Sequence, residues 1–264
     1  MSLLQYLGRR LAGFLARPRA WAAHPATSPH ARVAATLRKG DVLLVEGTSR
    51  FSSAIKYLTQ STWSHAALCI GDRWGPTDPD EPPRVLVDVD VIEGVRVIPL
   101  EAFSGLHTRI CRPIGLAPDE IDRLIDFMLQ RVGYMYDLKN ILDLARYLIR
   151  TPPLPGRSKR RLMALGSGEP TRAICSTLLA QAFESIRYPI LPEIEVIANG
   201  GLVAQAALEE ILHIRHHSLY APRDFDVSPF FQVIKPRLEG DFDFRRLVWS
   251  LAETPALPAV PPRS

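Results

Sequence analysis

Short apolar runs predict that the first half of the chain forms a β-sheet. Glycine, proline and aspartate residues separate the runs from one another, as they commonly separate strands. The runs occupy residues 40–47, 63–71, 84–92, 94–100 and 108–114. Such short runs favour strands, because a helix needs a longer periodic pattern. We therefore expect a sheet built mainly before residue 115, with one late strand at 228–236.

Helical periodicity follows this group of strands. Residues 118–132 begin with proline and two acidic residues, carry Arg131 in the last turn and stop before Gly133, which together are helix boundary signals. Residues 194–211 fit either a strand or a helix. Strands early and helices later predict an α+β fold, in which a sheet packs against helices. Further helical patterns occupy 50–61 (a short helix or a turn), 136–149 and 171–186.

Most of the 264 residues are expected to form one folded domain. Residues 1–36 contain a basic amphipathic segment and then, from residue 24, a stretch rich in Pro, Ser and Thr that is typical of a linker. The folded domain is expected at 37–250. Residues 251–264 are rich in proline and predict a disordered tail.

The net charge of +4 is too small by itself to indicate nucleic-acid binding, and no nucleic-acid partner is expected. The charge is unevenly distributed, because residues 1–40 contain seven Arg and Lys and no Asp or Glu. Residues 1–20 and the RSKRR cluster at 157–161 could therefore contact an anionic membrane surface. A solvated positive face is the alternative. No apolar run reaches the length of a membrane-spanning helix, and the N-terminus lacks the apolar core of a signal peptide.

The three cysteines predict neither a disulfide framework nor a zinc site, because no two of them are closely spaced. They fit a reducing compartment. We therefore expect a cytoplasmic protein, with a peripheral position at the inner face of the membrane as a second option. A run of histidines near residue 215 has no neighbouring carboxylate or cysteine to complete a metal site, so no metal or cofactor is expected. The three cysteines are Cys69, Cys111 and Cys175, and the histidines of the run are His213, His216 and His217.

The predicted helix at 171–186 places one cysteine where a nucleophile would be activated. Cys175 would lie in the first turn, next to the positive end of the helix dipole and to unpaired backbone N–H groups. Both favour the thiolate, which is the form that attacks carbonyl carbons. A cysteine that serves only as a small core residue is the alternative. The core-facing stripe at helical spacing is Cys175, Leu178, Leu179, Ala182 and Phe183.

A histidine in a predicted strand is the candidate base. His65 lies in the apolar run WSHAALCIG, where alternation places it on the same face as Cys69. A neutral imidazole beside a thiol can accept its proton, although a hydrogen-bonded core histidine is the alternative. A third polar group is expected to hold the imidazole. The next strand offers Asp88 and Asp90 on one face, and Glu93 follows; Asp88 is preferred because it is nearer the centre of the strand.

Together these stretches resemble the permuted, papain-like branch of the NlpC-type cysteine hydrolases. That branch includes bacterial permuted amidase-like proteins and is related to lecithin:retinol acyltransferase. The resemblance covers about residues 39–191 and rests on RKGDVLLVEG, STWSHAALCIGD, VLVDVDVIEGVRVIPL, GYMYDLKN and ICSTLLAQAF. The histidine strand precedes the cysteine helix, which is the permuted order. The resemblance implies a circularly permuted papain-like fold, with an antiparallel sheet or small barrel packed against helices and the cysteine at a helix N-terminus.

The resemblance also implies roles for individual residues. Cys175 would be the nucleophile, His65 the base, and Asp88 the polar group on the strand after the histidine. Tyr136, in GYMY, matches the tyrosine of the family's Gly-x-x-Tyr element and would help to stabilise the oxyanion; a core aromatic is the alternative. The implied reaction is attack of the Cys175 thiolate on an amide or ester carbonyl, followed by resolution of a thioester.

Three functions remain open at this point. The first is a cysteine hydrolase of the amidase or peptidase type. The second is a membrane-associated lipid acyltransferase or lipase with the same chemistry, which the basic segments favour. The third is a catalytically inactive module that binds a membrane surface. The sequence does not identify the substrate, whether peptide, amide or lipid.

Overall fold

A six-stranded antiparallel sheet lies at the centre of the computed structural model, which describes residues 17, 24, 26–75, 82–90, 93–135, 174–198, 208–213 and 220–236. The strand order is β4-β3-β2-β1-β5-β8. Each of the five predicted early runs contains one strand, and the late run contains β8. The strands are β1 (Val42–Val45), β2 (His65–Cys69), β3 (Arg84–Asp90), β4 (Gly94–Pro99), β5 (Thr108–Pro113) and β8 (Phe231–Ile234).

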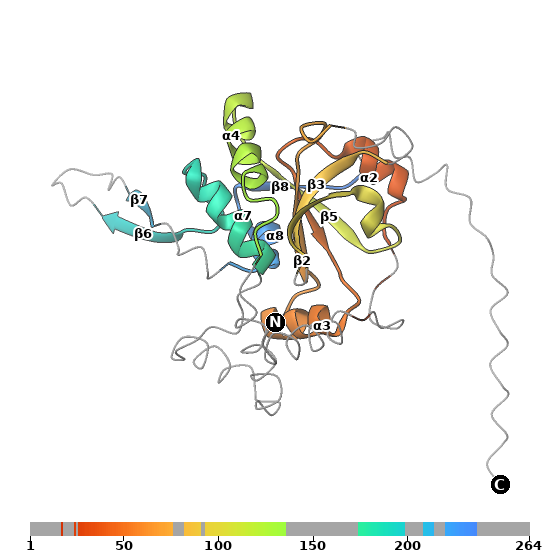
Figure 1. Ribbon diagram of the computed structural model, residues 1–264. Coiled ribbons are helices and arrows are strands. Elements are labelled where there is room, and N and C mark those ends of the chain that lie inside the picture. Colours follow the sequence, from red (N-terminus) through yellow and green to blue (C-terminus); the bar gives the residue numbers. More distant parts are fainter. Residues whose placement is uncertain are drawn as a thin grey trace, which may run out of the picture.

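Helices cover both faces of this sheet, which confirms the α+β prediction. In Figure 1, α4, α7 and α8 lie on one side of the sheet and α2 lies on the other. The short 3-10 helix η1 packs on the same side as α2, because its Leu100 joins Val33 of α2 in one apolar cluster. The helices are α2 (His30–Thr36), α3 (Arg50–Thr59), η1 (Leu100–Phe103), α4 (Pro118–Leu129), α7 (Ile174–Ser185) and α8 (Pro222–Val227).

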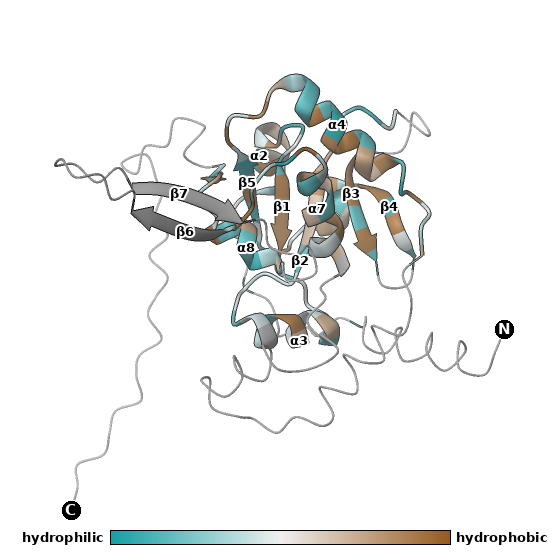
Figure 2. Ribbon diagram, turned by 90° about the vertical axis from the view of Figure 1, so that its left-hand side faces the viewer, coloured by the Kyte–Doolittle hydropathy of each residue, from teal (hydrophilic) through white to brown (hydrophobic). Residues whose placement is uncertain are grey.

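Alternation along the strands sends neighbouring side chains to two separate cores. Leu44 and Leu68 join the larger core under α4, α7 and α8. Leu43 and Ala67 join the smaller core under α2 and η1. Because both faces are buried, β1 is apolar throughout, as the brown colour of this strand shows in Figure 2. The continuous apolar runs in the sequence follow from this double burial.

Helix α4 begins where the sequence signals place it and ends earlier than predicted. The Glu120 side chain accepts a hydrogen bond from the backbone N–H of Ala117 at 2.9 Å, which satisfies one free donor before the first turn. The helix ends at Leu129, and residues 130–133 form a turn in which Gly133 has φ 87°. Arg131 therefore lies in this turn rather than in the last turn of the helix.

The stretch predicted as a linker contains helix α2. Val33 is its buried apolar residue, at 4% exposure. The end of the helix is held by Arg112, which donates to the carbonyl oxygen of Thr36 at 2.9 Å and also pairs with Asp41. One apolar residue gives no helical periodicity, so the sequence pattern does not reveal a helix that long-range contacts stabilise. The folded part thus extends before residue 37.

Residues 193–213 contain two strands of a separate sheet, which decides the ambiguous pattern in favour of strands. Strand β6 (Glu193–Ala198) pairs antiparallel with β7 (Leu208–His213). His213 is therefore the last residue of a strand. In the part of the chain that the structure describes, no helix is long and apolar enough to cross a membrane.

Several expectations lie outside the described residues. They concern Tyr136, the helix at 136–149, the basic cluster at 157–161, most of the N-terminal segment 1–24, and the tail at 251–264. His216 and His217 also belong to this group. These expectations stay predictions.

Candidate functional site

His65 and Asp88 form a hydrogen-bonded pair on neighbouring strands. His65 is the first residue of β2, and its side chain is 21% exposed, whereas the Asp88 side chain on β3 is 1% exposed. Nε2 of His65 lies 3.1 Å from Oδ2 of Asp88. The alternatives Asp90 and Glu93 instead lie beside Arg96, at 3.7 Å and 2.7 Å. The carboxylate that contacts the imidazole is therefore that of Asp88.

Arg96 holds the other side of Asp88. The two residues are directly opposite each other in the β3–β4 pair. Nε of Arg96 donates to Oδ1 at 2.8 Å, and a terminal nitrogen donates to Oδ2 at 3.2 Å. This bidentate contact fixes the plane of the carboxylate and satisfies a buried charge. Sequence reasoning missed Arg96, although a hairpin with a short turn after Asp90 gives this register.

The close packing of β4 requires a glycine beside this pair. Gly94 has φ 78°, and a Cβ atom at this position would lie 2.2 Å from the carbonyl oxygen of Tyr134. The same carbonyl accepts a hydrogen bond from the backbone N–H of Val95 at 3.0 Å, and Gly133 donates to the carbonyl of Val95 at 2.8 Å. The chain just before Tyr136 therefore runs alongside β4, the strand that carries Arg96.

Cys175 lies in the first turn of α7, as the helical stripe predicts. It is the second residue of the helix and is 4% exposed. All members of the predicted stripe are buried in the larger core. Helix α7 packs against β2 and β3, the strands of His65 and Asp88. The next residue, Ser176, donates from its hydroxyl to the carbonyl oxygen of Tyr220 at 2.7 Å, which fixes the start of the helix.

The His65 imidazole interacts with both Cys175 and Asp88, and these contacts determine its charge. Burial lowers the pKa of His65, but the charge of Cys175, the charge of Asp88 and hydrogen bonds to both raise the pKa to about 10. Burial raises the pKa of Asp88, while hydrogen bonds and charges of His65 and Arg96 lower it below its ordinary value. The arrangement therefore favours an imidazolium beside an ionised carboxylate at neutral pH.

The other two cysteines have different surroundings. Cys69 on β2 and Cys111 on β5 are 3% and 0% exposed. Burial raises the pKa of each thiol to about 12. Both thiols therefore stay protonated at neutral pH, where they are poor nucleophiles. Their burial in the core fits a packing role for Cys69 and Cys111.

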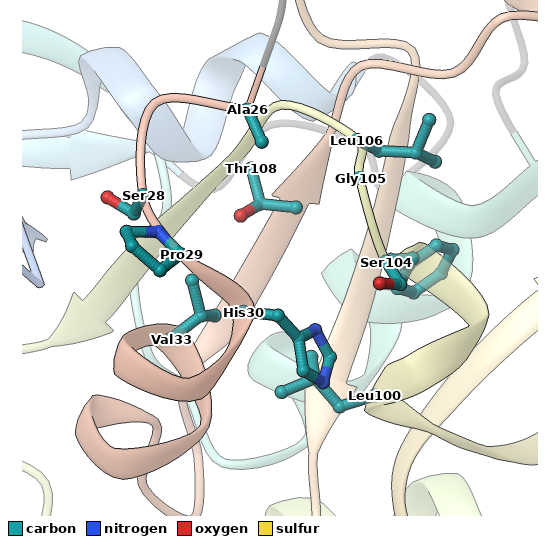
Figure 3. Close-up of a pocket in the computed structure, with 11 residues that line it drawn as sticks. Ala26, Ser28, Pro29, His30, Val33, Leu100, Ser104, Gly105, Leu106 and Thr108 are labelled. Carbon is teal, nitrogen blue, oxygen red and sulfur yellow. The ribbon is translucent and has the colours of Figure 1, made fainter.

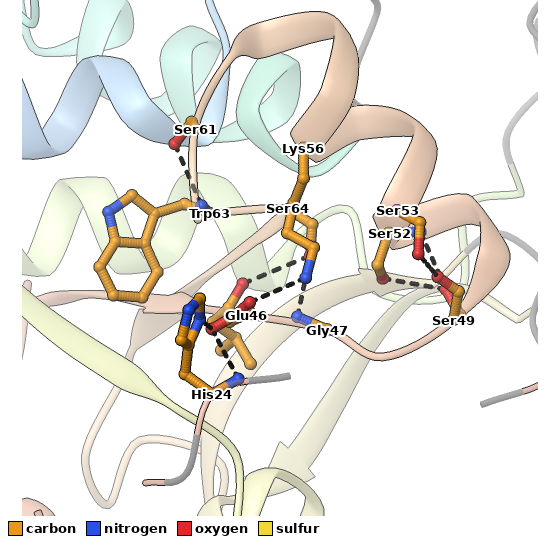
Figure 4. A network of polar contacts seen from close by, with 11 residues as sticks. His24, Glu46, Gly47, Ser49, Ser52, Ser53, Lys56, Ser61, Trp63 and Ser64 are labelled. Atoms are coloured by element: carbon orange, nitrogen blue, oxygen red, sulfur yellow. Dashed lines mark hydrogen bonds and ion pairs between the residues drawn. The ribbon is translucent and has the colours of Figure 1, made fainter. Parts of the chain in front are cut away.

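Two further features next to His65 were not predicted. The ring of Phe103, at the end of η1, stands edge-on to the imidazole, with 5.6 Å between the ring centroids. Glu46, one residue beyond the strand partner of His65, is buried at 2% exposure. In Figure 4, Lys56 of α3 and His24 both point at this carboxylate, at 2.8 Å and 2.9 Å. The Glu46 contacts hold α3 at the end of the sheet.

The charge of Glu46 is compensated inside the protein. Burial raises the pKa of this carboxyl group, whereas Lys56 and His24 lower it, and the net effect is a lowered pKa. Glu46 is therefore an ionised, paired group with a structural role. Within the described ranges, no group of three His, Cys, Asp or Glu side chains is arranged to hold a metal ion.

Comparisons with known proteins leave the family of the chain open. No family model matches the chain, and no curated protein matches it. Among solved structures, the chain is similar to "Crystal structure of metalloprotein yiiX from Escherichia coli O157:H7, DUF1105", with 14% identity and a TM-score of 0.42. The match covers 75% of this chain and 96% of the other. A similarity of this size establishes neither the family nor the activity of the chain.

Proposed function

We propose that this chain is a cysteine hydrolase of the permuted papain-like type, which cleaves an amide or ester bond through a thioester. One observation carries the proposal: a single imidazole, His65, contacts both a buried carboxylate and a thiol in the first turn of a helix. The antiparallel sheet with α7 packed on it, and the order of His65 before Cys175, support the permuted fold that the sequence resembles.

In the proposed mechanism each ring nitrogen of His65 has one task. Nε2 lies 3.1 Å from Oδ2 of Asp88, and Nδ1 would accept the proton of the Cys175 thiol. The proton that Cys175 loses is held on the imidazole, and the negative charge of Asp88 stabilises the resulting imidazolium. Arg96 keeps Asp88 ionised and oriented, so that Asp88 positions the base without removing its proton.

Acyl transfer then proceeds in two steps, acylation of Cys175 and hydrolysis of the thioester. The Cys175 thiolate adds to the carbonyl carbon, and the π electrons move to the oxygen, which the backbone N–H of Cys175 stabilises. His65 donates its proton to the leaving nitrogen or oxygen as the bond to carbon breaks, and a thioester remains. Water attacks the thioester as His65 accepts a proton from it. The carbon–sulfur bond breaks and restores the thiolate.

Labelling with a thiol-directed acyl probe tests this function. Cys175→Ala is expected to abolish labelling while the circular dichroism spectrum shows that the fold is retained. Cys69→Ala is the matched control, because it removes an equally buried thiol whose pKa is raised to about 12. Labelling that persists in Cys175→Ala and disappears in Cys69→Ala would show that the assignment is wrong.

A further inference from the structure

A cavity of about 370 Å³ lies between α2, η1 and β5, on the sheet face opposite α7. The volume lies within the range of about 300–1,000 Å³ that is typical of small-molecule sites. Because α7 carries Cys175, a molecule in this cavity is separated from the thiol by the sheet. Figure 3 shows Thr108 and His30 in the middle of the lining, Ser28, Pro29 and Val33 on one side, and Ser104, Gly105 and Leu106 on the other.

The lining of the cavity combines apolar side chains with uncharged polar groups. The apolar part comes mainly from Val33, Leu100, Phe103 and Leu106, and the hydroxyl groups come from Ser28, Ser104 and Thr108. None of the residues that line the cavity is Arg, Lys, Asp or Glu. An ion that entered would lose its hydration shell without gaining an opposite charge from the lining, which is unfavourable. The lining therefore favours an uncharged molecule.

One polar atom of a lining residue lacks a partner. Within the described residues, Nε2 of His30 is buried and makes no hydrogen bond. Oε1 of Glu101 lies 3.5 Å away, in a geometry that is not a hydrogen bond. A buried nitrogen of this kind is unfavourable until a partner reaches it. A hydroxyl group suits either tautomer of His30, because it both donates and accepts. A carboxylate would instead lie near the negative charge of Glu101.

Phe103 connects the cavity with the imidazole of the candidate site. Its ring lines the cavity and stands edge-on to the ring of His65, with 5.6 Å between the centroids. The strand register agrees, because Thr108 is directly opposite Val45, and Val45 is directly opposite His65. Neighbouring strands are about 4.8 Å apart, so the Thr108 position is roughly 10 Å from the His65 position along this row. A molecule that packs on Phe103 therefore alters the surroundings of the imidazole without reaching Cys175.

We propose that this cavity binds an uncharged small molecule that has an apolar body and one hydroxyl group, such as a small phenol or alcohol. The apolar body packs on the smaller core, and the hydroxyl group pairs with Nε2 of His30. Because Phe103 also contacts His65, the imidazole senses whether the cavity is filled. The binding does not require that Cys175 is a nucleophile, so it goes beyond the proposed function and is tested separately from it.

NMR titration of the full-length chain with four compounds that share a 4-ethylphenyl body tests the site. 4-Ethylphenol is expected to bind at least about fivefold more tightly than 4-ethyltoluene, which lacks the hydroxyl group. It should also bind more tightly than the anion 4-ethylbenzoate and the cation 4-ethylbenzylammonium. His30→Phe keeps a ring and removes the polar atom, so the preference for 4-ethylphenol over 4-ethyltoluene should disappear.

A second pair of variants tests the position of the bound molecule. Leu106→Trp fills the cavity from a half-buried position and should weaken binding of 4-ethylphenol at least about tenfold. Ala34→Trp is the matched control, since Ala34 is an exposed residue of α2 outside the lining. The ring resonances of His65 should shift along the same titration curve, and Phe103→Leu should remove most of this shift while 4-ethylphenol still binds.

Each outcome decides one part of the proposal. Absence of binding, equal affinity for the four compounds, tighter binding of either ion, or binding that persists in Leu106→Trp would overturn the site. Binding that leaves the His65 resonances unchanged would overturn the link to the imidazole. The titration needs no turnover, so a Cys175 that proves unreactive would contradict the proposed function alone.

Discussion

Replacement of Asp88 by asparagine removes one negative charge from the site and keeps the shape of the side chain. In the native protein this carboxylate is 1% exposed and lies 3.1 Å from Nε2 of His65. The rise in the pKa of His65 from 6.5 to about 10 corresponds to roughly 5 kcal/mol in favour of the imidazolium. Cys175 and Asp88 supply this preference together. Loss of one nearby opposite charge typically changes a pKa by about one to three pH units.

Asp88→Asn should therefore move the alkaline limit of activity downwards. The wild type is expected to lose activity as pH rises through about 10, where His65 loses its proton. In the variant this limit should fall by about one to three pH units. The rate at neutral pH should fall by a factor of roughly 10² to 10⁴, because the imidazole also loses the partner that orients it. The pH profile of kcat/KM for an acetyl ester measures both effects.

The same substitution should lower stability in a pH-dependent way. The raised pKa of His65 contributes stability that is complete below about pH 6.5 and is lost as pH rises through the native value. The lowered pKa of Asp88 contributes stability that is present above about pH 4 and is lost as pH falls. Urea unfolding near pH 6 should show a loss of about 3 kcal/mol. Asp90→Asn is the control, since Asp90 is 31% exposed. An unchanged alkaline limit in Asp88→Asn would refute the reasoning.

Two further substitutions test the contacts around the site. Arg96→Gln removes a positive charge next to Asp88 and His65, so the alkaline limit of activity should move to higher pH, opposite to the effect of Asp88→Asn. The kcat should fall about tenfold, because Asp88 is held less firmly. A move of the alkaline limit to lower pH would contradict this reasoning. Lys56→Met leaves the buried Glu46 with His24 as its remaining ionic partner in the described chain, so the free energy of unfolding in a chemical denaturant should fall by about 3 kcal/mol. The double variant Glu46→Gln with Lys56→Met should recover much of that loss, because it also removes the buried negative charge. A double variant no more stable than Lys56→Met would show that the buried ion pair is not the cause.

The sheet could be predicted from sequence because its strands are buried on both faces. Continuous apolar runs between glycine and aspartate residues leave few alternatives for residues 40–114, and each run contains one strand. The positions of the candidate site residues follow from local pattern only in part. Helical spacing predicts the inward position of Cys175 on α7. Strand alternation places His65 on the same face as Cys69, which belongs to the smaller core, whereas Cys175 belongs to the larger core, so alternation alone does not bring His65 and Cys175 together.

The rest of the site depends on contacts between distant residues, which no local pattern records. Phe103 meets His65 because η1 folds back across the smaller core, and Lys56 meets Glu46 because α3 closes the end of the sheet. Helix α2 has Val33 as its buried apolar residue and depends on Arg112 at its end. Arg96 is different, since the hairpin register predicts its place opposite Asp88 once the turn is located.

Site-resolved alkylation tests most directly whether Cys175 is a nucleophile activated by His65. Native protein is treated with iodoacetamide at neutral pH, and mass spectrometry of the peptides gives a rate for each cysteine. We predict that Cys175 reacts at least about a hundredfold faster than Cys69 and Cys111, whose thiols have a pKa of about 12, and that His65→Gln removes most of this difference. Equal rates at the three cysteines, or a fast Cys175 that is unaffected by His65→Gln, would contradict the proposed site.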